Sequence, residues 1–138
     1  MKRILNTNEF LHGGDYNPEQ WWDEPDVINQ DFALFKQAKI NTVTVGIFSW
    51  AKLEPEEGKY NFSWLDEIFD RVEKMNGHLV LATPSGARPA WLAQKYPEVL
   101  RTDNLGNKRG FGGRHNHCLT SPIYREKVRR SEEHTSEL

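Results

Sequence analysis

The apolar residues of this chain alternate between short runs typical of β-strands and longer runs with the spacing of an amphipathic helix. Short runs rich in β-branched residues occupy residues 41–46 and 78–83. A third short run, which ends in glycines, occupies residues 10–14. The three predicted strands recur roughly every 30 to 37 residues, with a helical segment between each pair. This period is typical of a parallel β/α fold.

Two helices are predicted between these strands. The first begins at Pro25, a residue that suits the first helical position, with Asp23 or Glu24 at its N-terminus. The second begins at Ser63, which resembles the first residue of a capping box with Asp66 three positions later. The apolar face of the second helix is formed by Leu65, Ile68, Phe69 and Val72.

Long segments follow the second and third predicted strands, over residues 48–60 and 84–120. The second of these segments contains a short helix predicted over 88–94 and a hairpin predicted over 100–109. A further helix is predicted from Pro122. In β/α barrels, long loops after strands form the face that carries the active site. The pattern therefore favours a barrel whose functional face is built from these segments.

The alternative fold is a doubly wound sheet that binds nucleotides. Such a sheet would need a glycine-rich, phosphate-binding turn between its first strand and first helix. Residues 13–18 read GGDYNP and do not match that turn. We therefore predict an α/β chain that forms part of a barrel.

Composition excludes some classes of function. The formal net charge is −2, with no basic patch interleaved with aromatic residues, so we expect no nucleic-acid partner. No apolar run approaches the roughly 20 residues of a membrane span, and the first ten residues do not form a convincing signal peptide. The single cysteine cannot form an internal disulfide. These features predict a cytoplasmic protein with no membrane partner.

The aromatic and acidic residues suggest a carbohydrate site, but they do not show which residues form it. Five tryptophans in 138 residues are many, and aromatic faces often line sugar sites, although core packing is the more frequent role of any one tryptophan. Glycoside hydrolysis usually needs two carboxyl groups. The carboxylates that follow predicted strands are Asp15, Glu19, Glu54, Glu56 and Glu57. We expect none of them to be catalytic, because Glu54 reads as a loop anchor and Glu56 and Glu57 as an exposed turn.

Residues 112–118 (GGRHNHC) place two glycines beside an arginine, two histidines and a cysteine. One interpretation is a ligand site, with Arg114 binding substrate or Cys118 binding a metal. The other is a loop held by its own hydrogen bonds. One cysteine with two nearby histidines is a weak metal signal, because structural zinc takes four ligands.

Four strings, in order, resemble the N-terminal signatures of glycoside hydrolase family 42, the bacterial β-galactosidases. They are DYNPEQW at 15–21, VGIFSWAKLEPEEG at 45–58, ATPSGARPAWL at 82–92, and FGGRHNHCLTSP at 111–122. The resemblance covers about residues 8–129 and is specific, because all four strings occur in the family's order.

The resemblance implies a (β/α)8 barrel of which this chain would be the first three or so β/α units, an incomplete barrel. It implies a retaining β-galactosidase with two catalytic glutamates, both outside this chain, and no required cofactor. Arg114 matches a family arginine that contacts galactose. Cys118 matches the first cysteine of a zinc site found in some members, the other ligands being outside this chain. Family members are often homotrimers.

One departure concerns the second predicted strand, where many members carry an arginine and a glutamate. This chain has Thr44 and Ile47 there. A sugar contact from that strand is therefore in question. Two alternatives remain: a small non-catalytic galactoside-binding module using Trp50, Trp91 and Arg114, or another barrel glycosidase of the same clan, which the order of the strings disfavours.

The last nine residues, 130–138, depart from the apolar spacing expected of a barrel helix, with only Leu138 as an apolar residue. Their sequence, RSEEHTSEL, also matches a translation of a common sequencing-library adapter. We therefore expect residues 1–129 to be the barrel portion and residues 130–138 to be a non-native tail.

Overall fold

A computed structural model describes residues 7–110 and 115–135. Three parallel strands form one sheet in the order β1-β2-β3. They are β1 (Gly13–Asp15), β2 (Thr42–Val45) and β3 (His78–Leu81). The α-helices are α1 (Pro25–Gln37), α2 (Trp50–Leu53), α3 (Ser63–Lys74), α4 (Ala90–Lys95) and α5 (Pro122–Thr135), and the 3-10 helices are η1 (Pro18–Trp21), η2 (Pro84–Gly86) and η3 (Pro97–Val99).

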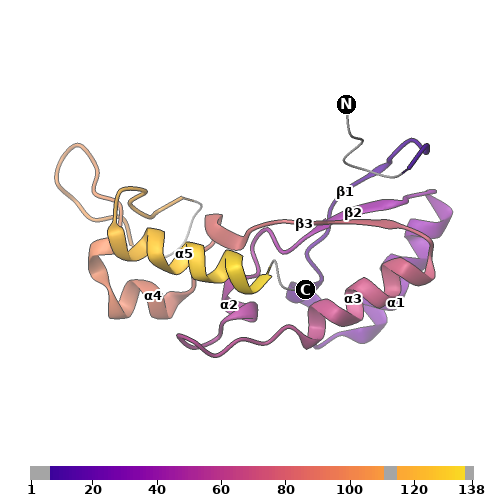
Figure 1. Cartoon of the computed structure of the whole chain (residues 1–138), viewed down its shortest axis with the longest axis horizontal. Helices are drawn as coiled ribbons and strands as arrows, with labels where there is room; N and C mark the ends of the chain where they lie inside the picture. The colour runs from indigo at the N-terminus through magenta and orange to yellow at the C-terminus, as the bar shows by residue number, and fades with distance from the viewer. Residues whose placement is uncertain (1–6, 111–114, 136–138) are drawn as a thin grey trace.

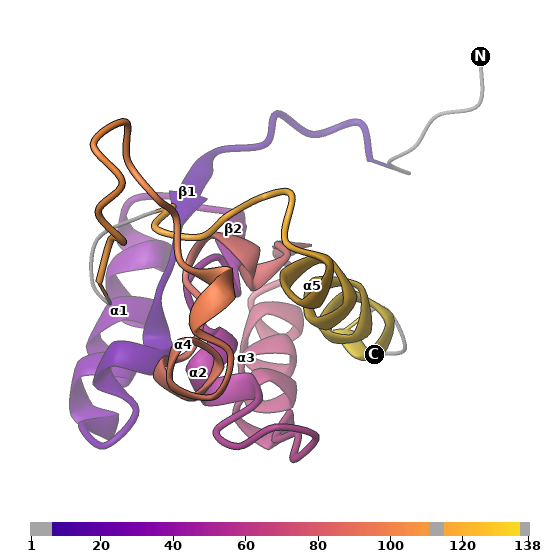
Figure 2. The ribbon, with the colours of Figure 1, turned by 90° about the vertical axis from the view of Figure 1, so that its left-hand side faces the viewer.

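Helices α1 and α3 connect the strands and lie on the same side of the sheet (Figure 1). Helices α2, α4 and α5 gather beyond the end at which the strands finish (Figure 1). The view at right angles shows α4 and α2 grouped in front of the sheet and α5 beside them (Figure 2). Each parallel strand pair is thus joined by a crossover helix, as in a β/α barrel.

The two faces of β2 differ in burial. Val43 and Val45 are buried on the face covered by the helices, whereas Thr42 and Thr44 alternate with them and are half-buried. Thr44 lies opposite Val80 of β3, whose side chain is 47% exposed. In a closed barrel the face opposite the helices points to the barrel interior.

Two apolar clusters hold the chain together. The first packs α1 and α3 against the sheet, and the second joins α2, α4, η3 and α5. Buried members of the first are Tyr16, Ile28, Val43, Val45, Leu53, Trp64, Leu65, Ile68 and Val72. Those of the second are Trp50, Leu92, Val99 and Tyr124. The chain therefore has separate cores for the sheet and for the loops that follow it.

The first predicted strand is misplaced. It was expected over 10–14 but pairs with β2 only from Gly13 onward, and Phe10 is 87% exposed. The Asn41 side chain accepts a hydrogen bond from His12 N (2.7 Å) and donates one to Phe10 O (3.0 Å). His12 O accepts backbone hydrogen bonds from Asn41 N and Thr42 N, at 3.0 and 3.2 Å, but the Asn41 side chain bonds the other groups, so the regular ladder begins at Gly13.

The predicted capping box is also wrong. Ser63 is the first residue of α3 and not its cap, which is Phe62. The Ser63 backbone N–H and hydroxyl both donate to Asn61 Oδ1, at 3.3 and 2.8 Å. Asn61 therefore supplies the acceptor that the serine was expected to provide, two residues earlier in the chain.

The remaining elements follow the predictions closely. Pro25 and Pro122 are the first residues of α1 and α5, and a bridge between Thr102 and Lys108 confirms the hairpin. The helix predicted over 88–94 begins two residues later, at Ala90. A residue before proline is disfavoured in the helical conformation, which excludes Arg88. Helix α5 continues through residue 130, and the origin of residues 130–138 stays a prediction.

Candidate functional site

The carboxyl ends of the three strands lie at one edge of the sheet, and the segments that follow them form the candidate site. In barrels this is the face that carries catalysis. The centre of the arrangement is Glu54, which is 2% exposed and follows α2. Its carboxylate accepts hydrogen bonds from Trp50 Nε1 and from Gly58 N, both at 2.8 Å. The expectation that Glu54 anchors its loop is confirmed.

The same residue connects two loops. The Glu54 carbonyl accepts a hydrogen bond from Trp91 Nε1 of α4 at 2.9 Å. This bond joins the segment after β2 to the segment after β3. Trp91 is half-buried, whereas Trp50 is completely buried. Trp50 is therefore a core residue whose ring offers no face to a sugar, while the ring of Trp91 is held in a fixed orientation.

The other carboxylates at this end of the sheet are dispersed. Asp15 is exposed at the end of β1. Both carboxylate oxygens of Glu19 are buried, with no hydrogen-bond partner among the described residues. Burial raises the pKa of Glu19, while the charge of Lys52 opposes that change. Glu56 is exposed and forms an ion pair with Lys59.

Glu57 is the centre of an ion cluster that ties its loop to α4 and α5. Its carboxylate forms ion pairs with Lys95 and with Lys127, the latter at 2.6 Å, and accepts a hydrogen bond from the Tyr96 hydroxyl at 3.0 Å. Hydrogen bonds from Lys127, Lys95 and Tyr96 lower the pKa of Glu57 to about 2. The expected exposed turn is thus correct for Glu56 but wrong for Glu57, which is tethered.

This pKa has a consequence for stability. Folding lowers the pKa of Glu57 from 4.5 to about 2. The contribution of the Glu57 carboxylate to the free energy of unfolding is therefore complete above pH 4.5 and is lost as pH falls toward 2. We expect Glu57→Gln to be less stable than wild type at pH 7, with a difference that shrinks between pH 4.5 and 2. Urea unfolding at several pH values measures this, with Glu56→Gln as control. A difference as large at pH 2.5 as at pH 7 would contradict the assignment.

Residues 115–118 contribute a buried histidine. His117 is 4% exposed, and its ring stacks on Tyr124 with centroids 4.1 Å apart and an interplanar angle of 15°. The Tyr124 hydroxyl donates to Ser85 O at 2.7 Å. Burial, then the charges of Arg88 and His115, lowers the pKa of His117. His117 is therefore a neutral, packed side chain at neutral pH.

Two residues of this cluster were missed from the sequence. Arg88 is only 5% exposed, and burial lowers its pKa while Tyr124 acts in the opposite direction. Tyr124 lies one turn into α5 and completes the second apolar cluster. In the sequence, the position of Arg88 between Ala87 and Pro89 was the only indication that its guanidinium would be buried. Arg114, the predicted galactose contact, lies outside the described residues.

Cys118 is half-buried, and its sulfur lies 3.1 Å from Thr120 Oγ1. Hydrogen bonding to Thr120 lowers the pKa of the thiol. The residue lines a cavity of about 480 Å³ together with Arg101, His115, His117, Leu119 and Thr120. Within residues 7–110 and 115–135, no three histidine, cysteine or acidic side chains converge as metal ligands. These residues supply one thiol and not a complete zinc site.

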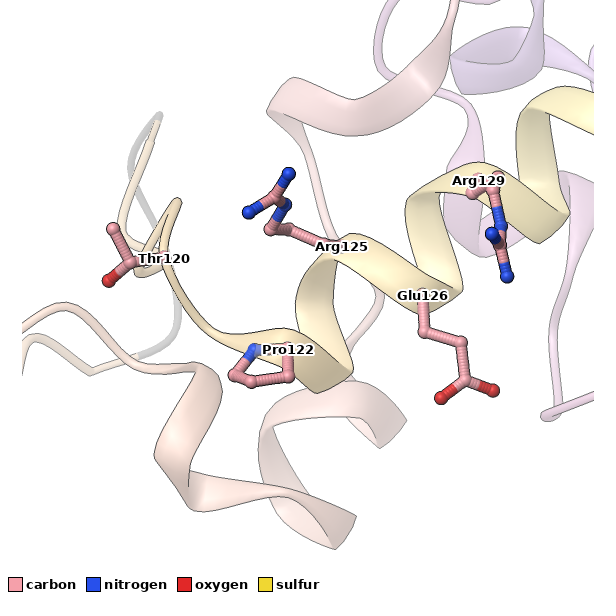
Figure 3. Close-up of a pocket in the computed structure, with 5 residues that line it drawn as sticks. All are labelled: Thr120, Pro122, Arg125, Glu126 and Arg129. Carbon is pink, nitrogen blue, oxygen red and sulfur yellow. The ribbon is translucent and has the colours of Figure 1, made fainter.

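A second hollow, of about 620 Å³, lies along α5 and is lined by Thr120, Pro122, Arg125, Glu126 and Arg129 (Figure 3). In this view the side chains of Arg125 and Glu126 point away from each other (Figure 3). The charged groups therefore do not converge on a common point, and this hollow has no arrangement suited to catalysis.

In the described part of the chain, no helix is both long and apolar enough to cross a membrane.

The fold and the loops after its strands are those of part of a β/α barrel, and comparison with known proteins identifies its family. The family model of glycoside hydrolase family 42, described as beta-galactosidase, matches residues 15–138. The chain belongs to this family. It is 61% identical over 124 residues to beta-galactosidase BglY of Alicyclobacillus acidocaldarius, and 61% identical over 120 residues to beta-galactosidase GanA of Bacillus subtilis.

These alignments cover 90% and 87% of this chain, and the chain spans about 18% of the length of each relative. Among solved structures, Gan42B, a family 42 beta-galactosidase, superposes with a TM-score of 0.92 and 55% identity over 96% of this chain and 19% of its own. The beta-galactosidase of Rahnella sp. R3 gives the same TM-score with 51% identity and the same two coverages. The predicted fold class, the first units of an incomplete (β/α)8 barrel, is confirmed.

Proposed function

We propose that this chain forms the opening β/α units of a retaining β-galactosidase, an enzyme that hydrolyses terminal non-reducing β-D-galactose residues in β-galactosides. The observation that carries this proposal is the 61% identity, over most of the chain, to enzymes named beta-galactosidase. The superposition on Gan42B supports it, because the same strands and decorated loops occur in the same order.

The catalytic pair is proposed to lie outside the described carboxylates. A retaining glycosidase needs two carboxyl groups about 5 to 5.5 Å apart. Glu54 is committed to Trp50 and Gly58, and Glu57 to Lys95 and Lys127. Neither is available to donate a proton or attack a sugar. The chain alone is therefore expected to be inactive, and its contribution is a wall of the galactose pocket.

Within that wall we assign substrate binding to Arg114, on the family string at 111–122. A guanidinium donates several hydrogen bonds in a fixed geometry, which suits recognition of sugar hydroxyls. The Glu54 network supports the same wall from behind, because it fixes the loops after β2 and β3 relative to each other. The alternative of a galactoside-binding module built on Trp50 is not favoured, because that ring is completely buried.

A chimera tests this function. Residues 15–129 of this chain would replace the matching segment of Bacillus subtilis GanA, and hydrolysis of 2-nitrophenyl β-D-galactoside would be measured. We expect Arg114→Ala to lower kcat/KM of the chimera by about tenfold to a hundredfold, the loss typical of a hydrogen bond to a charged group. Arg109→Ala, an exposed residue of the preceding hairpin, is the control. Equal losses at the two positions would contradict the role of Arg114.

Three further properties are proposed on the family resemblance. Cys118 would be one ligand of a zinc site in the whole enzyme, supported by its accessible thiol of lowered pKa. Zinc would supply structural stability there, and no chemical step depends on it. The whole protein is proposed to be a cytoplasmic homotrimer. Support for the cytoplasm is the single cysteine, which leaves no internal disulfide.

A further inference from the structure

A cationic cavity lies between the C-terminal ends of α1 and α3. It is at the edge of the sheet opposite the carboxyl ends of the strands. Its volume is about 570 Å³, and it is lined by Phe32, Lys36, Lys39, Ile40, Asn41, Arg71, Lys74, Met75 and Asn76. Asn41 immediately precedes β2 and Asn76 lies two residues before β3, so the cavity opens where the strands begin. In a barrel this is the face opposite to catalysis. The cavity is thus separate from the proposed galactose pocket.

The arginine of this cavity is already engaged. Arg71 Nε and Nη2 donate to Glu67 Oε1 at 3.0 and 2.8 Å, and Nη1 donates to Asn29 Oδ1 at 2.9 Å. The guanidinium also lies 5.7 Å from the ring centroid of Phe32. Arg71 therefore joins α3 to α1 and fixes the wall, and its planar fork is not available for a carboxylate ligand.

Unlike Arg71, the three lysines of the cavity have no charged partner among the described residues. Within residues 7–110 and 115–135, no ion pair or hydrogen bond engages the ammonium group of Lys36, Lys39 or Lys74. Their ammonium groups are strongly hydrated point charges that can each turn toward a shared anion. Phosphate oxygens accept hydrogen bonds from such groups without the planar geometry that a carboxylate and arginine prefer.

The charge of the cavity indicates the charge of its ligand. Four cations line it, and Glu67 neutralises one of them. The carboxyl ends of α1 and α3 each contribute about half a negative charge. Roughly two positive charges remain, which a dianion would neutralise. Asp31, the nearby acid of α1, is bound to the Tyr16 hydroxyl at 3.2 Å.

The floor of the cavity is apolar. Phe32 and Ile40 are half-buried members of the first apolar cluster, and Met75 closes the end of α3. Inorganic phosphate alone would leave this surface in water. A ligand that carries both a phosphate and an apolar or ring-shaped group would cover it. We propose that this cavity binds an organic phosphate monoester, with Lys36, Lys39 and Lys74 around the phosphate and Phe32, Ile40 and Met75 against the organic group.

Phenyl phosphate is the probe for this site. At pH 7.5 its phosphate is close to doubly ionised. Titrated into the ¹⁵N-labelled 138-residue chain, it is expected to cause saturable amide shifts confined to residues 32–41 and 71–76. Inorganic phosphate should bind about tenfold more weakly because it covers no apolar surface. Benzyl alcohol should not bind, and added salt should weaken phenyl phosphate.

A matched pair of variants completes the test. Lys36→Gln/Lys74→Gln should weaken phenyl phosphate at least about tenfold, since it removes two of the converging charges. Lys59→Gln/Lys108→Gln removes the same net charge from exposed positions elsewhere and should change affinity less than about twofold. Equal weakening by both pairs, shifts outside the two segments, or equal binding of benzyl alcohol would overturn the proposal. Because no step involves galactose, failure here leaves the proposed hydrolase function intact.

Discussion

Replacing Gly13 by alanine is expected to destabilise the chain by about 3 kcal/mol, because the strand pair β1–β2 has no room for a side chain there. Gly13 lies opposite Thr42 in the parallel register. A Cβ built on Gly13 would overlap the Thr42 carbonyl, which is backbone and cannot rotate away. The strand would have to separate from its neighbour, which breaks the first rung of the ladder.

Gly14 provides the matched control. A Cβ on Gly14 meets no atom within 4 Å, so Gly14→Ala should change stability by less than about 0.5 kcal/mol. Urea unfolding followed by far-ultraviolet circular dichroism measures both variants. If the two alanines were equally tolerated, the close approach of β1 to β2 would be wrong.

The second large effect is expected at Glu54. Glu54→Ala removes the acceptor for Trp50 Nε1 and Gly58 N and leaves the completely buried Trp50 donor without a partner. Hydrogen bonds to charged groups contribute about 1.5 to 3 kcal/mol each, and losses within one network are not additive. We expect a loss of roughly 3 kcal/mol in the free energy of unfolding.

Two further variants test whether the lost stability comes from the hydrogen bonds of the Glu54 carboxylate. Glu54→Gln keeps one amide oxygen as acceptor and should lose less than alanine does. Glu56→Ala, two residues away, removes only an exposed ion pair with Lys59 and should cost less than about 1 kcal/mol. Urea unfolding followed by far-ultraviolet circular dichroism compares the three variants. Equal effects of Glu54→Ala and Glu56→Ala would show that Glu54 is not the anchor.

Much of the fold follows from periodicity, since buried positions repeat regularly. Ile28 of α1 and the Leu65, Ile68 and Val72 series of α3 face the sheet as their spacing predicts. The errors arose where side chains replaced backbone bonds. The Asn41 side chain bonds Phe10 O and His12 N, so the regular ladder begins only at Gly13, and no apolar pattern reveals such a contact.

The candidate site was less predictable, because its key contacts join distant segments. The anchoring role of Glu54 was visible from its proline-flanked position, but its bond to Trp91 spans 37 residues. The buried cluster of Arg88, His117 and Tyr124 depends on α5 packing against the segment after β3. Local spacing cannot show that three such residues meet.

Hydrolysis of 2-nitrophenyl β-D-galactoside by the GanA chimera that carries residues 15–129 tests whether this chain belongs to a β-galactosidase. We expect kcat/KM within about tenfold of GanA, with the β-anomer cleaved and the α-anomer left intact, because the wall supplied by this chain has the same fold as the segment it replaces. A chimera that folds with native-like circular dichroism but does not hydrolyse the β-galactoside would show that the proposed function is wrong.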